Sequence, residues 1–425
     1  MAAWPRCRWV VWSRFVASMV TPDQVSVGVL VTAVPRDAVD EAVAACGVGA
    51  RRAGGKLPPH VTAYLTLAMS LFPDDDYAEV AQKVTGSLDR FGCWDAAWAP
   101  PSASGITQAR KRLGRMVMAE VFERVAGQVA TLSTRGAWLR GRLLLAIDGF
   151  DVDVPDTEEN AAEFGYAGTG EKRSAFPKIR VVALAECGTH AFRAAEVGGW
   201  AAGERTLARG LLMRLNRDEV LTADRGFYSF DNWALAAGTG ADLIWRAPTG
   251  LNLPVVRVLS DGTFLTVLIN PEITGGRRRE RLLAAAKAGD ELDPDEAHLA
   301  RVVEYDIPDR AGNGTGELVV VLTTILDPRQ ARADEVAAGY NERWEEETAN
   351  DQLKTHLRGP GRVLRSRLPD LAVQEMWAWL IVQYALTALI AGAAEAAEID
   401  PDRVGFARTL RLVRRSATGT ADISP

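Results

Sequence analysis

The chain has 425 residues, of which 48% are hydrophobic, and its formal net charge is −6. A chain of this length buries one large core or two to three smaller ones, and its acidic balance argues against nucleic-acid binding through overall positive charge, so any such contact needs local basic clusters. The four cysteines are scattered and form no CxxC pair, which argues against a disulfide framework or a zinc site and predicts a cytoplasmic protein.

The first 130 residues are predicted to be helical. Residues 1–19 superficially resemble an export signal, but Arg14 interrupts their apolar run and no cleavage site follows, so we predict no export. Ser102 or Ser104 is the expected N-cap of the last helix. The predicted helices cover residues 35–47, 58–72, 75–84 and 102–114.

The helix at 102–114 carries a short basic cluster formed by Arg110, Lys111 and Arg112. One interpretation is an ordinary solvated helix face. The other is a helix that contacts DNA, because arginine suits base edges and phosphates. The sequence alone leaves both open.

From residue 142 the pattern changes to strands alternating with helices, which predicts an α/β sheet with parallel elements. A β-rich insertion follows at 247–326, with a hairpin turn at Asp261-Gly262, and a long helix is expected to begin at Asp327-Pro328. The apolar run 376–394 is long enough to span a membrane, but Gln383 and Thr387 interrupt it, which favours a buried core helix. The strands are predicted at 142–147, 178–186, 189–197, 219–223, 241–246, 255–269, 301–307 and 317–326, and the helices between them at 203–215 and 228–238.

Two aspartates, Asp148 and Asp224, each directly follow an apolar strand run. Ligands of open α/β sheets bind outside the carboxyl ends of the strands, so both acids are expected in one site. The alternative for either is structural, as a turn residue or a helix cap. The four histidines are also scattered, so any metal is expected to be held by carboxylates, which suit hard ions such as Mg²⁺.

The stretch YNERWEEETANDQLK (340–354) places a tyrosine, an arginine, a glutamate and a lysine on one side of a predicted helix. At about 100° per residue, Arg343, Glu347 and Lys354 all fall within roughly 60° of Tyr340. Glu345 falls outside this stripe and is expected to be solvated. An ion-paired surface stripe would explain the pattern, but one carboxylate beside two cations is also what a metal-bound phosphate requires.

The spacing of Tyr340, Arg343, Glu347 and Lys354 resembles the signature of DDE transposases of the insertion-element-four group. Asp148-Gly149 and Asp224-Arg225-Gly226 also resemble that family, and the similarity extends over roughly residues 20–418. The resemblance implies a ribonuclease H-like mixed sheet with a β-rich insertion, preceded by a helical DNA-binding domain. The implied divisions are 1–130 for the helical domain, 131–246 and 327–425 for the core, and 247–326 for the insertion.

The resemblance also implies a mechanism and a set of residues. Asp148, Asp224 and Glu347 would be the DDE triad and would hold two Mg²⁺ ions, with Mn²⁺ as a substitute, for cut-and-paste transposition. The expected partners are terminal inverted repeats, target DNA and a second subunit, with no membrane. The DNA-binding set is Tyr340, Arg343 and Lys354, with Arg225 and Arg246 as weaker candidates beside Arg110, Lys111 and Arg112.

Two other functions remain open: a catalytically silent DNA-binding derivative, and a ribonuclease H-like nuclease of another purpose. In relatives, a tryptophan of the insertion stacks on a flipped base, but no tryptophan lies between Trp245 and Trp344 here. Phe264 is the better substitute and Tyr305 the other, unless Phe264 simply packs inward.

Overall fold

The computed structural model describes residues 32–49, 57–89, 101–307 and 317–417. The export-like residues 1–19, and with them Cys7, lie outside these ranges, as does Cys93. Cys46 is partly buried and Cys187 is buried.

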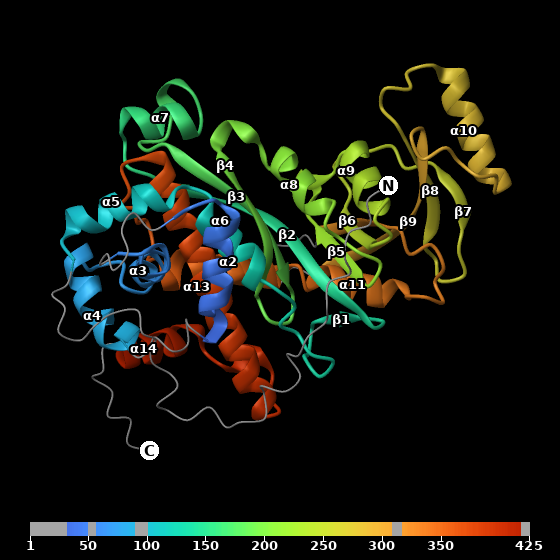
Figure 1. The fold of residues 1–425 in the computed structure, drawn as a ribbon. Helices are drawn as coiled ribbons and strands as arrows, with labels where there is room; N and C mark the ends of the chain where they lie inside the picture. The colour runs from blue at the N-terminus through green and yellow to red at the C-terminus, as the bar shows by residue number, and fades with distance from the viewer. Residues whose placement is uncertain (1–31, 50–56, 90–100, 308–316, 418–425) are drawn as a thin grey trace.

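A mixed sheet runs through the described part of the chain, with the strand order β4-β3-β2-β5-β6-β10-β9-β8-β7 (Figure 1). β2 pairs antiparallel with β3 and parallel with β5, which pairs parallel with β6. The ribonuclease H-like α/β fold predicted from the sequence is confirmed. The strands are β1 Trp138–Leu139, β2 Arg142–Asp153, β3 Lys178–Glu186, β4 Phe192–Gly199, β5 Glu219–Ala223, β6 Asp242–Arg246, β7 Val255–Val258, β8 Phe264–Ile269, β9 Ala297–Ile307 and β10 Glu317–Thr323.

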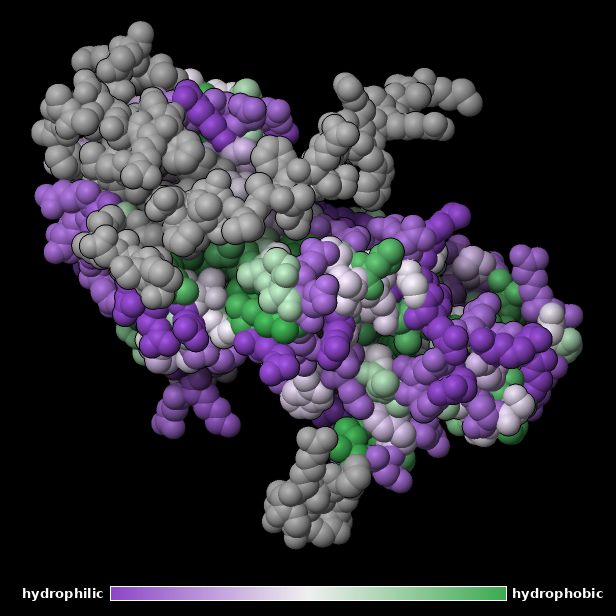
Figure 2. Space-filling model, turned by 90° about the horizontal axis from the view of Figure 1, so that it is seen from below, coloured by the Kyte–Doolittle hydropathy of each residue, from purple (hydrophilic) through white to green (hydrophobic). Residues whose placement is uncertain are grey.

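The strands of the β-rich segment extend this sheet, because β10 pairs antiparallel with β6 and with β9. The segment also contains a helix that was not predicted, α10 (Gly276–Ala288), whose arginine-rich first turns are largely exposed. In Figure 2 this end of the molecule, at the right, is mostly hydrophilic.

Helices cover both faces of the sheet. α8 (Glu204–Leu212) and α9 (Phe230–Ala237) share a core with the odd-numbered residues of β2, such as Leu145 and Ile147. α11 (Ala333–Asn341) packs on the other face against Leu144 and Ala146. This is the two-residue alternation of a strand buried on both sides.

The signature segment is not the single long helix that was predicted. α11 ends at Asn341, a turn follows at 342–343, α12 covers Trp344–Asp351, and a π-helix (η5) covers Gln352–Leu357. A π-helix has more residues per turn than an α-helix, so the position of Lys354 does not follow from 100° per residue.

The N-terminal helices pack against the C-terminal ones (Figure 1). α3 (Pro59–Leu71) and α6 (Val117–Val125) contact α13 (Pro369–Ala396), and the three share one hydrophobic core that includes Leu67, Phe122 and Trp379. α13 is long and apolar enough to cross a membrane, but 78% of its apolar window is buried within the protein. It is the core helix expected from the sequence. The other helices here are α2 Arg36–Ala45, α3 Pro59–Leu71, α4 Tyr77–Asp89, α5 Ala103–Leu113, α6 Val117–Val125, which was not predicted, and α14 Phe406–Ala417.

Arg110 does not take part in the exposed basic cluster. It is fully buried, and its guanidinium donates to the Leu371 carbonyl at 2.8 Å, to Tyr77 Oη at 2.9 Å and to Gln374 Oε1 at 3.3 Å. The prediction that it contacts DNA is therefore wrong: Arg110 joins α5 to the start of α13. Lys111 and Arg112 are exposed, and Ser102 is the N-cap, accepting from the Gly105 amide.

Replacing Arg110 with Met should lower the free energy of unfolding by on the order of 3 kcal/mol, because buried acceptors lose their donor. Urea unfolding followed by circular dichroism measures this. The matched control is Lys111→Met, an exposed neighbour, which should change the stability by less than about 0.5 kcal/mol. Equal effects of the two substitutions would contradict the buried role of Arg110.

Candidate active site

Three polar residues lie side by side on the parallel strands. The register pairs Ile147 with Ala223, and Ala223 with Trp245. The next residue along each strand is Asp148, Asp224 and Arg246. Successive side chains alternate between faces, so all three project from the face opposite Ile147.

Asp148 was expected at a strand end, and here the structure differs. β2 continues to Asp153 because residues 148–153 still pair with β3. Only the parallel pairing with β5 stops at Ile147. The ladder on that side therefore opens at Asp148, which has the same effect as a strand end.

α11, the turn at 342–343 and α12 carry Tyr340, Arg343 and Glu347, respectively, over this face. Arg343 Nη2 donates to Glu347 Oε1 at 3.2 Å, and its guanidinium lies 5.9 Å from the centre of the Tyr340 ring. Tyr340 and Arg343 are buried, whereas the Glu347 side chain is 45% exposed. The structure thus brings together three of the four signature residues.

The electrostatics of Arg343 connect it to the aspartates. Burial alone would lower the pKa of its guanidinium, but Tyr340, Glu347, Asp224 and Asp148 together raise it. Burial likewise raises the pKa of the Tyr340 hydroxyl, and Asp224 contributes to the increase. The Arg343 guanidinium is therefore positively charged and interacts electrostatically with all three predicted acids.

Asn350 is a site residue that the sequence analysis missed. It is buried, and its side-chain amide donates to Asp148 Oδ2 at 3.1 Å. It follows Glu347 by three residues, a spacing that places both on one side of a helix. That spacing was the available signal, and Asn350 orients one carboxylate toward the helix that carries another.

Lys354, on η5, lies against the part of β2 that follows Asp148. Its ammonium is 5.8 Å from the centre of the Phe150 ring, and Phe150 is two residues beyond Asp148 and on the same face. Lys354 therefore borders the acids without contacting Arg343 or Glu347 in any hydrogen bond or ion pair recorded for the described residues.

Arg246 and Tyr305 border the site on the other side. Arg246 forms an ion pair with Glu317, and although burial opposes it, Glu317, Tyr340 and Asp224 raise its pKa. Burial, helped by Tyr340, raises the pKa of Tyr305 to about 12, so its hydroxyl stays protonated and donates to Asn341 Oδ1 at 3.1 Å.

The remaining predicted residues lie apart from this group. Arg225 is exposed and donates to Thr249 Oγ1 at 3.4 Å. Phe264 packs inward, against the core that it shares with α9. Tyr305 is therefore the insertion aromatic that borders the acids. Glu345, which was expected to be solvated, is partly buried: its side chain is 29% exposed, and its carboxylate is 2.7 Å from Nε2 of buried His190.

The donor set suits hard divalent cations. Asp148, Asp224 and Glu347 offer carboxylate oxygens, the ligands that Mg²⁺ and Mn²⁺ prefer. Asp151 and Asp153, which the sequence analysis left out, pair instead with Arg180 and Lys178. Asp148, Asp224 and Glu347, with the Arg343 guanidinium beside them, can therefore hold a metal ion and a phosphate together.

Comparisons with known proteins give consistent results. Residues 24–123 match the family model of the insertion element 4 transposase N-terminal domain, and residues 139–384 match the transposase DDE domain. Transposase InsG for insertion sequence element IS4 of Escherichia coli K12 is 26% identical over 379 residues, covering 87% of this chain and 78% of the relative.

Two further similarities were found, one over a shorter stretch of sequence and one to a solved structure. The putative transposase InsZ of Escherichia coli K12 is 31% identical over 152 residues, covering 35% of this chain and 50% of the relative. A piggyBac transposase synaptic complex with hairpin DNA has a TM-score of 0.48 at 10% identity, covering 95% of this chain and 81% of that one. A likeness this distant carries no conclusion about the present chain.

Replacing Asp224 with Asn should weaken Mn²⁺ binding by roughly 10–100-fold or more, the loss expected when a ligand or its support is removed. Titration followed by electron paramagnetic resonance measures the free ion. Asp151→Asn, a partner of Arg180 on the same strand as Asp148, is the matched control and should leave the affinity unchanged. Equal losses in both variants would contradict this metal centre.

Proposed function

This chain belongs to the insertion element 4 family of DDE transposases, and we propose that Asp148, Asp224 and Glu347 are its catalytic triad. It is a DNA transposase, an enzyme that cleaves and transfers DNA strands with divalent metal. The observation that carries the assignment of the triad is the register of β2 and β5, which makes Asp148 and Asp224 neighbours. Arg343 links them electrostatically to Glu347.

We propose Mg²⁺ as the physiological metal, with Mn²⁺ able to replace it. Two such ions would supply the activation of the attacking water or 3′-hydroxyl and the stabilisation of the leaving oxygen in an in-line displacement. The triad would hold the ions through its carboxylates, and Asn350 would fix the orientation of Asp148.

The cations of the site are proposed to bind the DNA backbone. Arg343 already has Glu347 as a partner and presents a guanidinium suited to phosphate. Lys354 would hold the next phosphate along β2, with Tyr340, Arg246 and Arg225 at the border. Lys111 and Arg112, exposed on α5, would contact DNA outside the site.

The sequence-level predictions of assembly remain proposals. We propose that the DNA bound is the pair of terminal inverted repeats plus a target, and that a homodimer supplies one active site per end. The scattered cysteines suggest the cytoplasm as the compartment. If a hairpin forms, Tyr305 is the proposed stacking aromatic, because it lies beside Tyr340 and Arg343. Neither the silent derivative nor another nuclease is favoured by any observation.

Substituting Ala for any one of Asp148, Asp224 and Glu347 should abolish nicking of element ends and leave binding of those ends largely intact. The carboxylates hold metal and contribute no attraction to phosphate. Cleavage on denaturing gels and gel shifts, run on the same preparations, separate the two effects. Asp153→Ala is the control and should still cleave. A triad variant that cleaves at the wild-type rate would remove that residue from the assignment.

Replacing Lys354 with Ala should weaken DNA binding and reduce the slope of log affinity against log salt by about 0.9, the value of one phosphate contact. Binding measured by fluorescence anisotropy at several salt concentrations gives the slope. Lys172→Ala, which removes an exposed lysine of the 3₁₀-helix at Gly170–Lys172, is the matched control. An unchanged slope for Lys354→Ala would show that Lys354 contacts no phosphate.

A further inference from the structure

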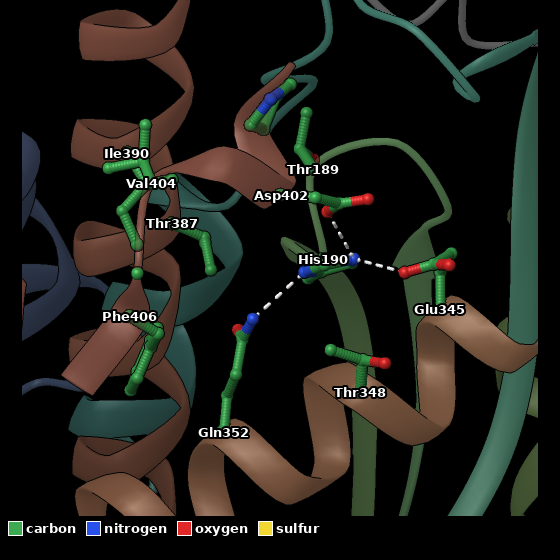
Figure 3. Close-up of a pocket in the computed structure, with 12 residues that line it drawn as sticks. Thr189, His190, Glu345, Thr348, Gln352, Thr387, Ile390, Asp402, Val404 and Phe406 are labelled. Atoms are coloured by element: carbon green, nitrogen blue, oxygen red, sulfur yellow. Dashed lines mark hydrogen bonds and ion pairs between the residues drawn. The ribbon is translucent and has the colours of Figure 1, made fainter.

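A second group of potential metal ligands lies outside the triad. Nε2 of His190 is 2.7 Å from Glu345 Oε2 and 3.4 Å from Asp402 Oδ1, and these ligand atoms all lie within 4.8 Å of one another (Figure 3). The three residues come from different segments: the turn between β3 and β4, helix α12, and the 3₁₀-helix η6 (Pro401–Arg403). One histidine and two carboxylates form a mixed donor set that binds divalent transition metals.

His190 is held in place by its surroundings. Its side chain is 8% exposed, and its backbone adopts a left-handed φ of 59°, a conformation that non-glycine residues adopt at a cost. Gln383, one of the two polar residues that interrupt the apolar run of α13, is fully buried and donates to the His190 carbonyl at 2.7 Å. The core helix thus holds the backbone at His190 in place.

The group borders a cavity that carries excess negative charge. The cavity has a volume of about 310 Å³ and is lined by His190, Glu345, Gln352 and Thr387, among others. Burial raises the pKa of the Asp402 carboxyl, and Glu345 and Asp400 raise it further, while His190 opposes them. The carboxylates of Glu345, Asp400 and Asp402 therefore carry more negative charge than one positive charge on His190 would balance.

Gln352 supplies an independent sign of a ligand. Its amide nitrogen is 2.9 Å from His190 Nδ1, while its Oε1 is buried in the cavity lining and has no hydrogen-bond partner among the described residues. Turning the amide by half a rotation, which leaves its shape unchanged, makes Oε1 accept from Nδ1–H and moves the amide nitrogen into the unpartnered position in the cavity lining. The lone pair of His190 Nε2 then faces two carboxylates, so either a metal ion or a proton must lie between them.

We propose that His190, Glu345 and Asp402 bind a divalent transition-metal ion, with Gln352 orienting the imidazole from behind. A metal-bound histidine commonly donates its other nitrogen to such an oriented acceptor. The ion would connect the β3–β4 turn and η6 to α12 through Glu345, which lies two residues before Glu347. The site is distinct from the catalytic triad. Because it ties α12 to two other segments, it would stabilise the position of the helix that carries Glu347.

Cobalt titration of the full-length Asp224→Asn variant tests this site, since Asp224→Asn disables the triad centre. That variant should still bind one Co²⁺ with an absorption spectrum of nitrogen ligation, and Co²⁺ should raise its Tm. Adding Asp402→Asn should weaken Co²⁺ affinity by more than the roughly 10–100-fold that loss of an outer-shell partner costs. Gln352→Leu should fall within that range. Glu395→Gln, an exposed acid of α13, is the control and should change nothing.

Two results would overturn the proposal: an Asp224→Asn variant that binds no Co²⁺, or an unchanged affinity after adding Asp402→Asn. Asp402 is half exposed, so its substitution should leave the fold intact, which circular dichroism checks. Either failure would leave the group as an imidazolium bonded to two carboxylates. The triad assignment would be untouched, because its tests use Mn²⁺ binding and nicking.

Discussion

The parallel pairing of β2 with β5 and of β5 with β6 is the constraint on which the rest of the site depends. It places Asp148, Asp224 and Arg246 one after another across three strands. The alternation of strand side chains then turns all three toward α11 and α12. A register shift of one residue would bury the carboxylates among Ile147, Ala223 and Trp245 on the opposite face. The hydrophobic cores on the two faces therefore fix the chemistry as well as the fold.

The cover over these strands is positioned by residues far away in the sequence. α13 shares a core with the N-terminal helices and also packs against η5, which continues α12. Gln383 of α13 holds the carbonyl of His190, and His190 contacts Glu345 on α12. The buried helix that resembles a membrane span in composition is thus the support for the helix that carries Glu347. Of its two polar interruptions, Thr387 lines the cavity beside His190, and Gln383 donates to the His190 carbonyl.

Sequence reasoning performed well where a pattern is local and failed where a partner is distant. The strand runs before Asp148 and Asp224 were visible because apolar runs ending in Asp are local signals. The burial of Arg110 was not, because its partners Tyr77 and Leu371 are far along the chain. The helical wheel grouped Tyr340, Arg343 and Glu347 correctly although the helix breaks at 342–343, since a short turn keeps neighbours together. The helical wheel predicted a solvated Glu345 because it carries no information about the β3–β4 turn, which partly covers that side of α12.

The central claim is that Asp148, Asp224 and Glu347 form one metal centre on a single face of the sheet. Anomalous diffraction from crystals of the protein soaked in Mn²⁺ tests this most directly, because it locates the metal without reference to activity. We expect anomalous peaks touching all three carboxylates, on the side of β2 that faces α12. Peaks confined to the opposite face, near Asp151 and Glu204, with none between Asp148 and Asp224, would contradict it.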